Sequence, residues 1–166
     1  MVLKNLGSAI LVLFSFCAFC QTSAQMRFLE KVNEVRSNGC TCGTTYMQAV
    51  PPLKWNGRLF ESALSQAKDM EKNHFFAHYS HNGLNIGERL DKFGYNWLFA
   101  GENLGEGQST FDEVMRDWIN SRSHCKMIMN PKVEEIGIAN YNDFWVQHFG
   151  KPKSVNKRLT AKTALN

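Results

Sequence analysis

The chain lacks a hydrophobic run long enough to cross a bilayer. Its extended apolar stretch, Leu6 to about Cys20, is shorter than the roughly 20 residues that a transmembrane helix needs. Lys4 precedes this stretch and the small residues 22–24 follow it, which is the pattern of a secretory signal peptide. We therefore predict a signal peptide over residues 1–24 that is cleaved before Gln25. The mature chain is then expected to be secreted, extracellular or periplasmic, with no transmembrane segment.

Cysteine is also scarce. Of the five in the chain, Cys40, Cys42 and Cys125 remain after the predicted cleavage. None of them has the C-x₂-C spacing of structural zinc sites, and export favours a disulfide. A bond between Cys40 and Cys42 would close a small, strained ring. We expect Cys125 to pair with Cys40 or Cys42, and either pairing leaves one thiol over.

Acidic residues are missing from the C-terminal segment, where residues 151–166 hold five lysines and arginines and no acid. With these five and Lys4 taken from the total of 19, thirteen basic residues remain in residues 25–150, against all 15 acidic ones. The body therefore carries a charge of about −2, and the overall +4 does not indicate a nucleic-acid partner. We expect one globular domain over residues 25–150 and a flexible basic tail over residues 151–166.

Complete catalytic motifs are absent as well. The chain has no His-Glu-x-x-His of metalloproteases and no Gly-x-Ser-x-Gly of serine hydrolases. A histidine cluster does occur at residues 74–81. If a helix continued through it, His74 and His78 would share one face and could chelate zinc or copper. The simpler interpretation is that His74 ends a helix, where a partly positive imidazole is favourable, and that His81 lies in a solvated turn.

Helical and strand periodicities are segregated along the chain, which favours an α+β fold. The helical pattern predicts helices over Met26–Arg36, Leu59–Asn73 and Ile86–Phe93, a helix that begins after Thr110, and a turn of helix over Ser123–Met129. The alternating pattern predicts strands over residues 135–139 and 144–149, joined by a hairpin, and a further strand within residues 97–104.

Several short motifs follow one another in a characteristic order. They are Phe75-Phe76 with His78, Gly83, Arg89-Leu90, Gly94-Tyr95, Ala100-Gly101-Glu102-Asn103-Leu104, Trp118-x-x-Ser121-x-x-His124, Met129-Asn130-Pro131, Glu135-Ile136-Gly137, and Tyr141 followed by Trp145-Val146-Gln147-His148-Phe149-Gly150. Over about residues 28–150 this series resembles the CAP superfamily (cysteine-rich secretory proteins, antigen five and pathogenesis-related-one proteins), and in particular its bacterial branch of SCP-domain extracellular proteins. The resemblance implies a three-layer α-β-α sandwich with a central antiparallel sheet and a surface cleft.

The resemblance also implies a site in that cleft. Eukaryotic members hold two histidines and two glutamates there, and the cleft can bind a divalent cation. His78 matches the first histidine and Glu102 the first glutamate, whereas Ser121 stands at the second glutamate and Phe144 or its neighbour at the second histidine. His124 matches a histidine of the bacterial members and is expected to refill the second imidazole place. The implied metal ligands are His78 and His124, with Glu102 as a third, for a divalent cation such as zinc.

The sequence allows three interpretations of this cleft. We expect a binding module for a small apolar, lipid-like or cell-envelope ligand, with Ser121 lining the cleft and Arg89 bracing it or pairing with an acid such as Glu88 or Asp91. The alternative is a metal-assisted hydrolase, with the two imidazoles as ligands and the carboxylate as base. In a third interpretation the histidine–glutamate contact is a structural hydrogen-bond network.

Overall fold

The computed structural model describes residues 9–154, with the backbone alone for residues 9–22. In chain order, the elements are α1 Ala9–Asn38, β1 Cys40–Cys42, β2 Thr45–Met47, β3 Lys54–Trp55, α2 Gly57–Asn73, α3 Ile86–Lys92, β4 Trp97–Glu106, α4 Phe111–Asn120, α5 Arg122–Ile128, β5 Glu135–Tyr141 and β6 Phe144–Pro152. The predicted helices and strands are all found, some with longer bounds. The short strands β1, β2 and β3 were not predicted, because two or three residues between glycines and prolines give no periodic signal.

The main sheet has the strand order β3-β5-β6-β4. The pairs β5–β6 and β4–β6 are antiparallel, as expected. The edge strand β3 differs, because Lys54 and Trp55 pair with β5 in parallel. The turn between β5 and β6 is tight, and Asn142 adopts φ 49°, a left-handed conformation that asparagine tolerates well.

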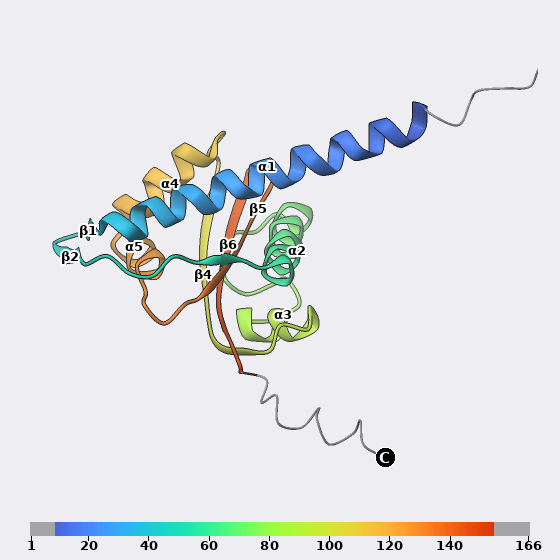
Figure 1. The fold of residues 1–166 in the computed structure, drawn as a ribbon. Helices are drawn as coiled ribbons and strands as arrows, with labels where there is room; N and C mark the ends of the chain where they lie inside the picture. The colour runs from blue at the N-terminus through green and yellow to red at the C-terminus, as the bar shows by residue number, and fades with distance from the viewer. Residues whose placement is uncertain (1–8, 155–166) are drawn as a thin grey trace, which may run out of the picture.

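Helices cover both faces of this sheet, which gives the three-layer sandwich that the resemblance implied. Figure 1 shows α2 and α3 on one side of the strands and α4 and α5 on the other, with the long α1 running across the same side as α4. On the α1 side, Val32, Val114 and Trp118 belong to one buried apolar cluster with residues of the sheet. On the other side, Ala63, Ala67 and Met70 of α2 pack against Val146 of β6.

Capping side chains fix where the helices begin. The Asn56 side chain accepts hydrogen bonds from the backbone of the first turn of α2. Asn85 and Glu88 form a capping box at the start of α3. Thr110 and Glu113 do the same for α4, which begins after Thr110 as the sequence predicted. These caps set the position of α3, which supplies one of the charged groups described below.

A glycine allows α2 to lie directly on the sheet. A Cβ atom built at Gly137 of β5 would lie 2.0 Å from the Phe60 backbone nitrogen, far inside van der Waals contact. Only a residue without a side chain fits between this strand and the helix. The loop that follows α2 is thereby brought to the edge of β4 and β6, where the polar cluster lies.

The predicted signal peptide and basic tail lie at the ends of the described region. Residues 1–8 are outside it, and residues 9–24 form the first part of α1, so cleavage before Gln25 stays a prediction. Within residues 9–154, no helix combines the length and apolar character that a membrane span requires. The first two residues of the predicted tail belong to β6, and Lys151 forms an ion pair with Glu134 at 2.7 Å. Residues 155–166 lie outside the described residues.

Candidate functional site

The polar cluster is centred on the carboxylate of Glu102 in β4, whose side chain is 3% exposed. His78 Nδ1 donates to Oε1 at 2.7 Å, and His148 Nε2 donates to Oε2 at 2.7 Å. The Arg89 guanidinium donates a further, short hydrogen bond to Oε2. Both oxygens of the carboxylate are therefore occupied by donors from other parts of the chain.

The strand register brings two of these groups together. Glu102 and His148 are direct cross-strand partners in the β4–β6 pair, so their side chains lie on the same face of the sheet. The other two groups come from the helical layer, since His78 lies in the loop after α2 and Arg89 on α3. The cluster thus joins one face of the sheet to the helices that cover it.

Arg89 also anchors the loop that carries His78. Its guanidinium donates at 2.9 Å to the backbone oxygens of His78 and Leu84, and more weakly to Ser80 Oγ at 3.3 Å. The predicted bracing role of Arg89 fits these bonds. A single buried guanidinium sets the position of the His78 backbone and balances the charge of Glu102.

The acid that pairs with Arg89 differs from the neighbours that the sequence suggested. Glu88 accepts from the Asn85 backbone at 2.8 Å in the capping box, and Asp91 accepts from Trp97 Nε1 at 3.1 Å. Both are occupied on the helix surface, so Glu102 is the partner instead. Nearness in sequence suggested these two acids, whereas tertiary packing supplies one from β4.

Burial and hydrogen bonding act in opposite directions on the pKa of Glu102. Burial raises it, but the hydrogen bonds from His148 and His78 more than offset this and hold the pKa at about 2. The hydrogen bond to Glu102 raises the pKa of His78, in spite of partial burial. Burial lowers the pKa of His148, although Glu102 opposes this. Near neutral pH, the centre is a carboxylate held by a neutral buried imidazole and a guanidinium.

His148 was missed as a site residue. Its Nδ1 is buried and has no hydrogen-bond partner among the described residues, consistent with a neutral ring that donates through Nε2 alone. A signal for it existed in the sequence, because residues two and four apart in a strand share a face. His148 is four residues after Phe144 in β6 and therefore shares its face. At the position where eukaryotic members carry the second histidine, Phe144 places a phenyl ring, which stacks on Phe76 at 6.3 Å between centroids.

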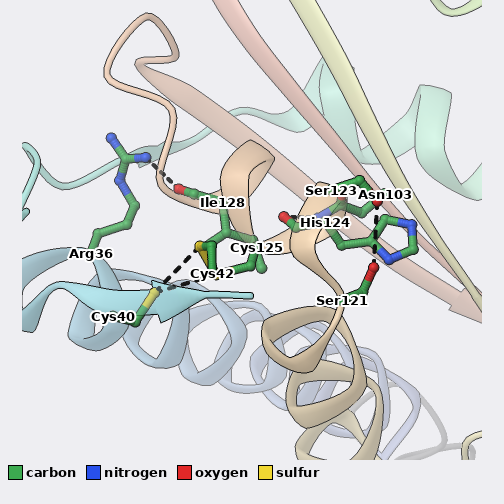
Figure 2. Close-up of a disulfide and its surroundings, with 9 residues drawn as sticks. All are labelled: Arg36, Cys40, Cys42, Asn103, Ser121, Ser123, His124, Cys125 and Ile128. Carbon is green, nitrogen blue, oxygen red and sulfur yellow. Dashed lines mark hydrogen bonds between the residues drawn. A yellow bond between two sulfur atoms is a disulfide. The ribbon is translucent and has the colours of Figure 1, made fainter. Parts of the chain in front are cut away.

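His124 and Ser121 lie close together where α4 gives way to α5 (Figure 2). The buried Asn103 side chain ties α5 to the sheet by donating to the His124 carbonyl at 3.2 Å. Burial lowers the pKa of His124, and electrostatic repulsion from His78 lowers it further. Among residues 9–154, no side chain is hydrogen-bonded to the His124 ring.

Beside these side chains is a pocket of about 370 Å³. Its lining residues come from β4, α4, the start of α5 and the loop after α2, and they are Phe76, Leu104, Gly105, Glu106, Gln108, Asp117, Trp118, Ser121 and His124. Ser121 and His124, both predicted to line a cleft, are part of it. Trp118 is almost fully buried and donates from Nε1 to the Leu104 carbonyl at 2.7 Å, so this wall is rigid.

The three cysteines gather elsewhere. Within residues 9–154, one group of three His, Cys, Asp or Glu residues has its ligand atoms within 4.8 Å of one another, and it consists of Cys40, Cys42 and Cys125. Cys42 and Cys125 form a disulfide, one of the two pairings that the sequence allowed, and Cys40 is the remaining thiol.

The predicted metal ligands are less closely grouped. In the described part of the chain, His78, His124 and Glu102 do not form a group with all ligand atoms within 4.8 Å. Nor do His74 and His78 share a helix face, because α2 ends at Asn73 and His74 is its C-cap with φ 53°. The histidine cluster at residues 74–81 is therefore not a helical chelating pair.

The sequence model of the cysteine-rich secretory protein family (CAP) matches residues 29–149. The chain is 34% identical over 104 residues to the uncharacterized protein YkwD of Bacillus subtilis strain 168, a match that covers 61% of this chain and 40% of that protein. It therefore spans less than half the length of this relative.

Among solved structures, the chain is similar to an extracellular protein of Bacillus anthracis that contains an SCP domain. The TM-score is 0.70 at 25% identity, over 78% of this chain and 41% of that one. Its fold is also similar to that of an outer surface protein of Borrelia burgdorferi, with a TM-score of 0.67 at 22% identity, over 77% of this chain and 92% of that one.

Proposed function

Because this chain belongs to the cysteine-rich secretory protein family, in its bacterial branch, we propose that it is a secreted binding module for a small, uncharged and largely apolar ligand. The observation that carries the proposal is the pocket beside His124, which combines apolar walls from Phe76, Leu104 and Trp118 with a few polar groups. Its volume of about 370 Å³ lies within the range of roughly 300–1,000 Å³ that small-molecule sites occupy.

The charges around the pocket narrow the class of ligand. The carboxylates of Glu106 and Asp117 both line it, so an anionic head group would meet like charge. The hydroxyl of Ser121 and the imidazole of His124 can instead bond a neutral polar group. A lipid-like molecule from the cell envelope that ends in a hydroxyl meets these requirements better than a fatty acid does.

A hydrolase has less support from the same residues. Glu102 has a pKa of about 2 and both of its oxygens accept hydrogen bonds, so it is a poor proton acceptor near neutral pH. The hydroxyls of Ser121 and Ser123 lie 3.4 Å from each other, and no histidine within residues 9–154 is hydrogen-bonded to either. The cleft therefore offers binding groups without a paired nucleophile and base.

Two of the three ligands that the resemblance implied, His78 and His124, can hold a divalent cation such as zinc. The bond from His78 Nδ1 to Glu102 leaves Nε2 available on a side chain that is 60% exposed, and a carboxylate behind an imidazole is a common way of orienting a metal ligand. The His124 ring is likewise available. We place the ion on the two imidazoles, with Glu102 as the orienting group; when bound, it would supply a Lewis acid that anchors an oxygen of the ligand.

Filling the pocket should abolish ligand binding. We expect the mature chain to bind 1-decanol saturably and to bind decanoate, with the same chain length, about tenfold more weakly, which corresponds to about 1.4 kcal/mol. Ser121→Phe should reduce decanol binding by at least about tenfold, because the phenyl group would occupy the cavity. Equilibrium dialysis with radiolabelled ligands measures all of these affinities.

Ser123→Phe is the matched control, since Ser123 is exposed on the same helix and does not line the pocket. It should bind decanol as the unmodified chain does. The proposal is wrong if decanol does not bind, or if Ser121→Phe and Ser123→Phe bind it equally well.

Zinc binding should depend on the two imidazoles. We expect isothermal titration of Zn²⁺ into the metal-free chain to saturate near one equivalent, and the heat to disappear in a His78→Ala, His124→Ala double variant. A His74→Ala, His81→Ala double variant is the control and should retain the heat. Equal zinc affinity in both double variants would rule out the proposed ligands while leaving the apolar pocket untouched.

A further inference from the structure

The three cysteines bring their sulfur atoms into direct contact. Cys40 Sγ lies 3.5 Å from Cys125 Sγ and 3.9 Å from Cys42 Sγ, close to the separation of touching sulfur atoms (Figure 2). The strand β1 explains this arrangement, because residues two apart in a strand project to the same face. Both cysteines of β1 therefore point at α5, which carries Cys125.

Of the three cysteines, Cys40 alone has surface that solvent can reach. Cys42 and Cys125 are fully buried, whereas Cys40 is partly exposed. A dissolved thiol or disulfide therefore meets Cys40 first, and the disulfide of Cys42 and Cys125 is shielded from it. Cys40 is therefore both the exposed thiol and the thiol in contact with the buried disulfide.

We propose that this cluster is a thiol–disulfide exchange site, in which Cys40 transfers the bond between the protein interior and low-molecular-weight thiols or dialkyl disulfides in solution. In the oxidised chain, the Cys40 thiolate attacks Cys125 Sγ. The Cys40–Cys125 bond forms, the Cys42–Cys125 bond breaks, and Cys42 leaves with the electron pair and takes up the proton that Cys40 released. No outside oxidant or reductant is needed for this step.

The second stage involves the external compound. A thiolate RS⁻ attacks Cys40, which now carries the bond at the surface, and forms Cys40–S–S–R while Cys125 is released as a thiol. A second RS⁻ then frees Cys40 and yields R–S–S–R, so two electrons pass from two external thiols to the protein. Run in reverse, the same steps oxidise the reduced chain at the expense of an external disulfide.

Proximity and ring strain, rather than the resting alignment of the three sulfurs, select Cys125 as the attacked sulfur. It is the nearer of the two, and attack on Cys42 would instead close the strained ring between residues two apart. Burial raises the pKa of the Cys40 thiol, so exchange should accelerate with rising pH as the thiolate forms. The attack releases Cys42 as a thiolate in a buried position, which is unfavourable. At rest, the equilibrium therefore favours the Cys42–Cys125 bond.

Arg36 holds the surroundings of the cluster in place during exchange. Its buried guanidinium donates to the carbonyls of Pro51, Ile128 and Asn130, with bonds of 2.6 Å to Pro51 and to Ile128. Figure 2 shows it directed at Ile128, at the end of the helix that carries Cys125. Burial lowers the pKa of Arg36 only to about 10, so it stays charged near neutral pH.

The test compares disulfide reduction in two variants. The oxidised, folded chain and its Cys40→Ser variant are treated with reduced glutathione, quenched in acid, alkylated and mapped by mass spectrometry. We expect Cys40→Ser to be reduced at least about tenfold more slowly, because direct attack on the shielded bond remains its only route. The difference should vanish in denaturant, where the three cysteines no longer lie together.

A second variant tests the intermediate directly. Cys42→Ser leaves Cys40 and Cys125 in contact, and we expect air oxidation of the folded variant to link them quantitatively. The proposal is overturned if Cys40→Ser is reduced at the unmodified rate in the folded state, or if folded Cys42→Ser keeps both remaining cysteines as thiols. A Cys40–Cys125 peptide with Cys42 alkylated, captured from the unmodified chain, would support it.

Discussion

Replacing Glu102 with glutamine is expected to lower the free energy of unfolding by about 3 kcal/mol near neutral pH, since removal of one partner from a buried ionic cluster leaves the others uncompensated. Arg89 and His148 would keep their buried positions but face an uncharged amide. Urea unfolding measures the change. Glu106→Gln, an exposed carboxylate on the same strand, is the control and should change stability by less than about 0.5 kcal/mol.

The same substitution should also alter the acid dependence of stability. The pKa of Glu102 is lowered from 4.5 to about 2 in the folded chain. A carboxyl group with a depressed pKa contributes stability above its unfolded pKa and loses that contribution as the pH falls through the folded value. The part of the difference between the unmodified chain and Glu102→Gln that comes from the carboxyl group should therefore be complete above about pH 5.5 and shrink between about pH 5 and pH 2. A further part comes from His78, whose pKa Glu102 raises from 6.5, and it should be lost as the pH rises above that value. A difference that stays constant down to about pH 2 would contradict the assigned role of the carboxylate.

Removing the disulfide should have an effect of similar size. A Cys42→Ala, Cys125→Ala double variant is expected to lose about 4 kcal/mol of stability. The bond joins positions 83 residues apart, and without it the unfolded chain gains the entropy of a loop of that length. The melting temperature should fall by roughly 10 °C or more for a domain of this size. Scanning calorimetry under non-reducing conditions gives the value.

Cys40→Ala is the control that removes a cysteine side chain but leaves the bond intact. It keeps the disulfide and truncates a partly exposed side chain, so its stability should change by less than about 1 kcal/mol. An unchanged melting temperature in the double variant would mean that packing alone holds the β1–β2 hairpin against α5.

Much of the fold could be predicted from local signals. Helical periodicity marks the helices in the sequence, including one that begins after Thr110, and the alternation after Glu135 marks the β5–β6 hairpin. The parallel pairing of β3 could not be predicted, since it depends on where the chain returns after α1 and not on its own two residues. Local sequence signals determine where the helices and the longer strands form, whereas long-range packing determines how β3 pairs at the edge of the sheet.

The site was predicted less completely than the fold. The family resemblance placed His78 and Glu102 in one cleft, where they are hydrogen-bonded to each other. For Arg89 the sequence offered bracing of the cleft or pairing with a nearby acid, whereas its partner Glu102 lies 13 residues further along the chain. His148 was overlooked because a histidine in a largely buried strand looks like part of the core. Its role requires the register between β4 and β6, which only the structure supplies.

The main-chain bonds of Arg36 have a consequence for how the domain responds to reduction of its disulfide. None of these bonds involves sulfur, so reduction of the cysteines removes no donor or acceptor from any of them. In a reducing environment the domain would therefore lose part of its stability, but the β1–β2 hairpin would stay packed against α5. The Cys42–Cys125 bond could then form again without refolding. The oxidation state of the cysteines then depends on the most recent redox conditions. The shape of the domain depends instead on the Arg36 hydrogen bonds, which contain no sulfur.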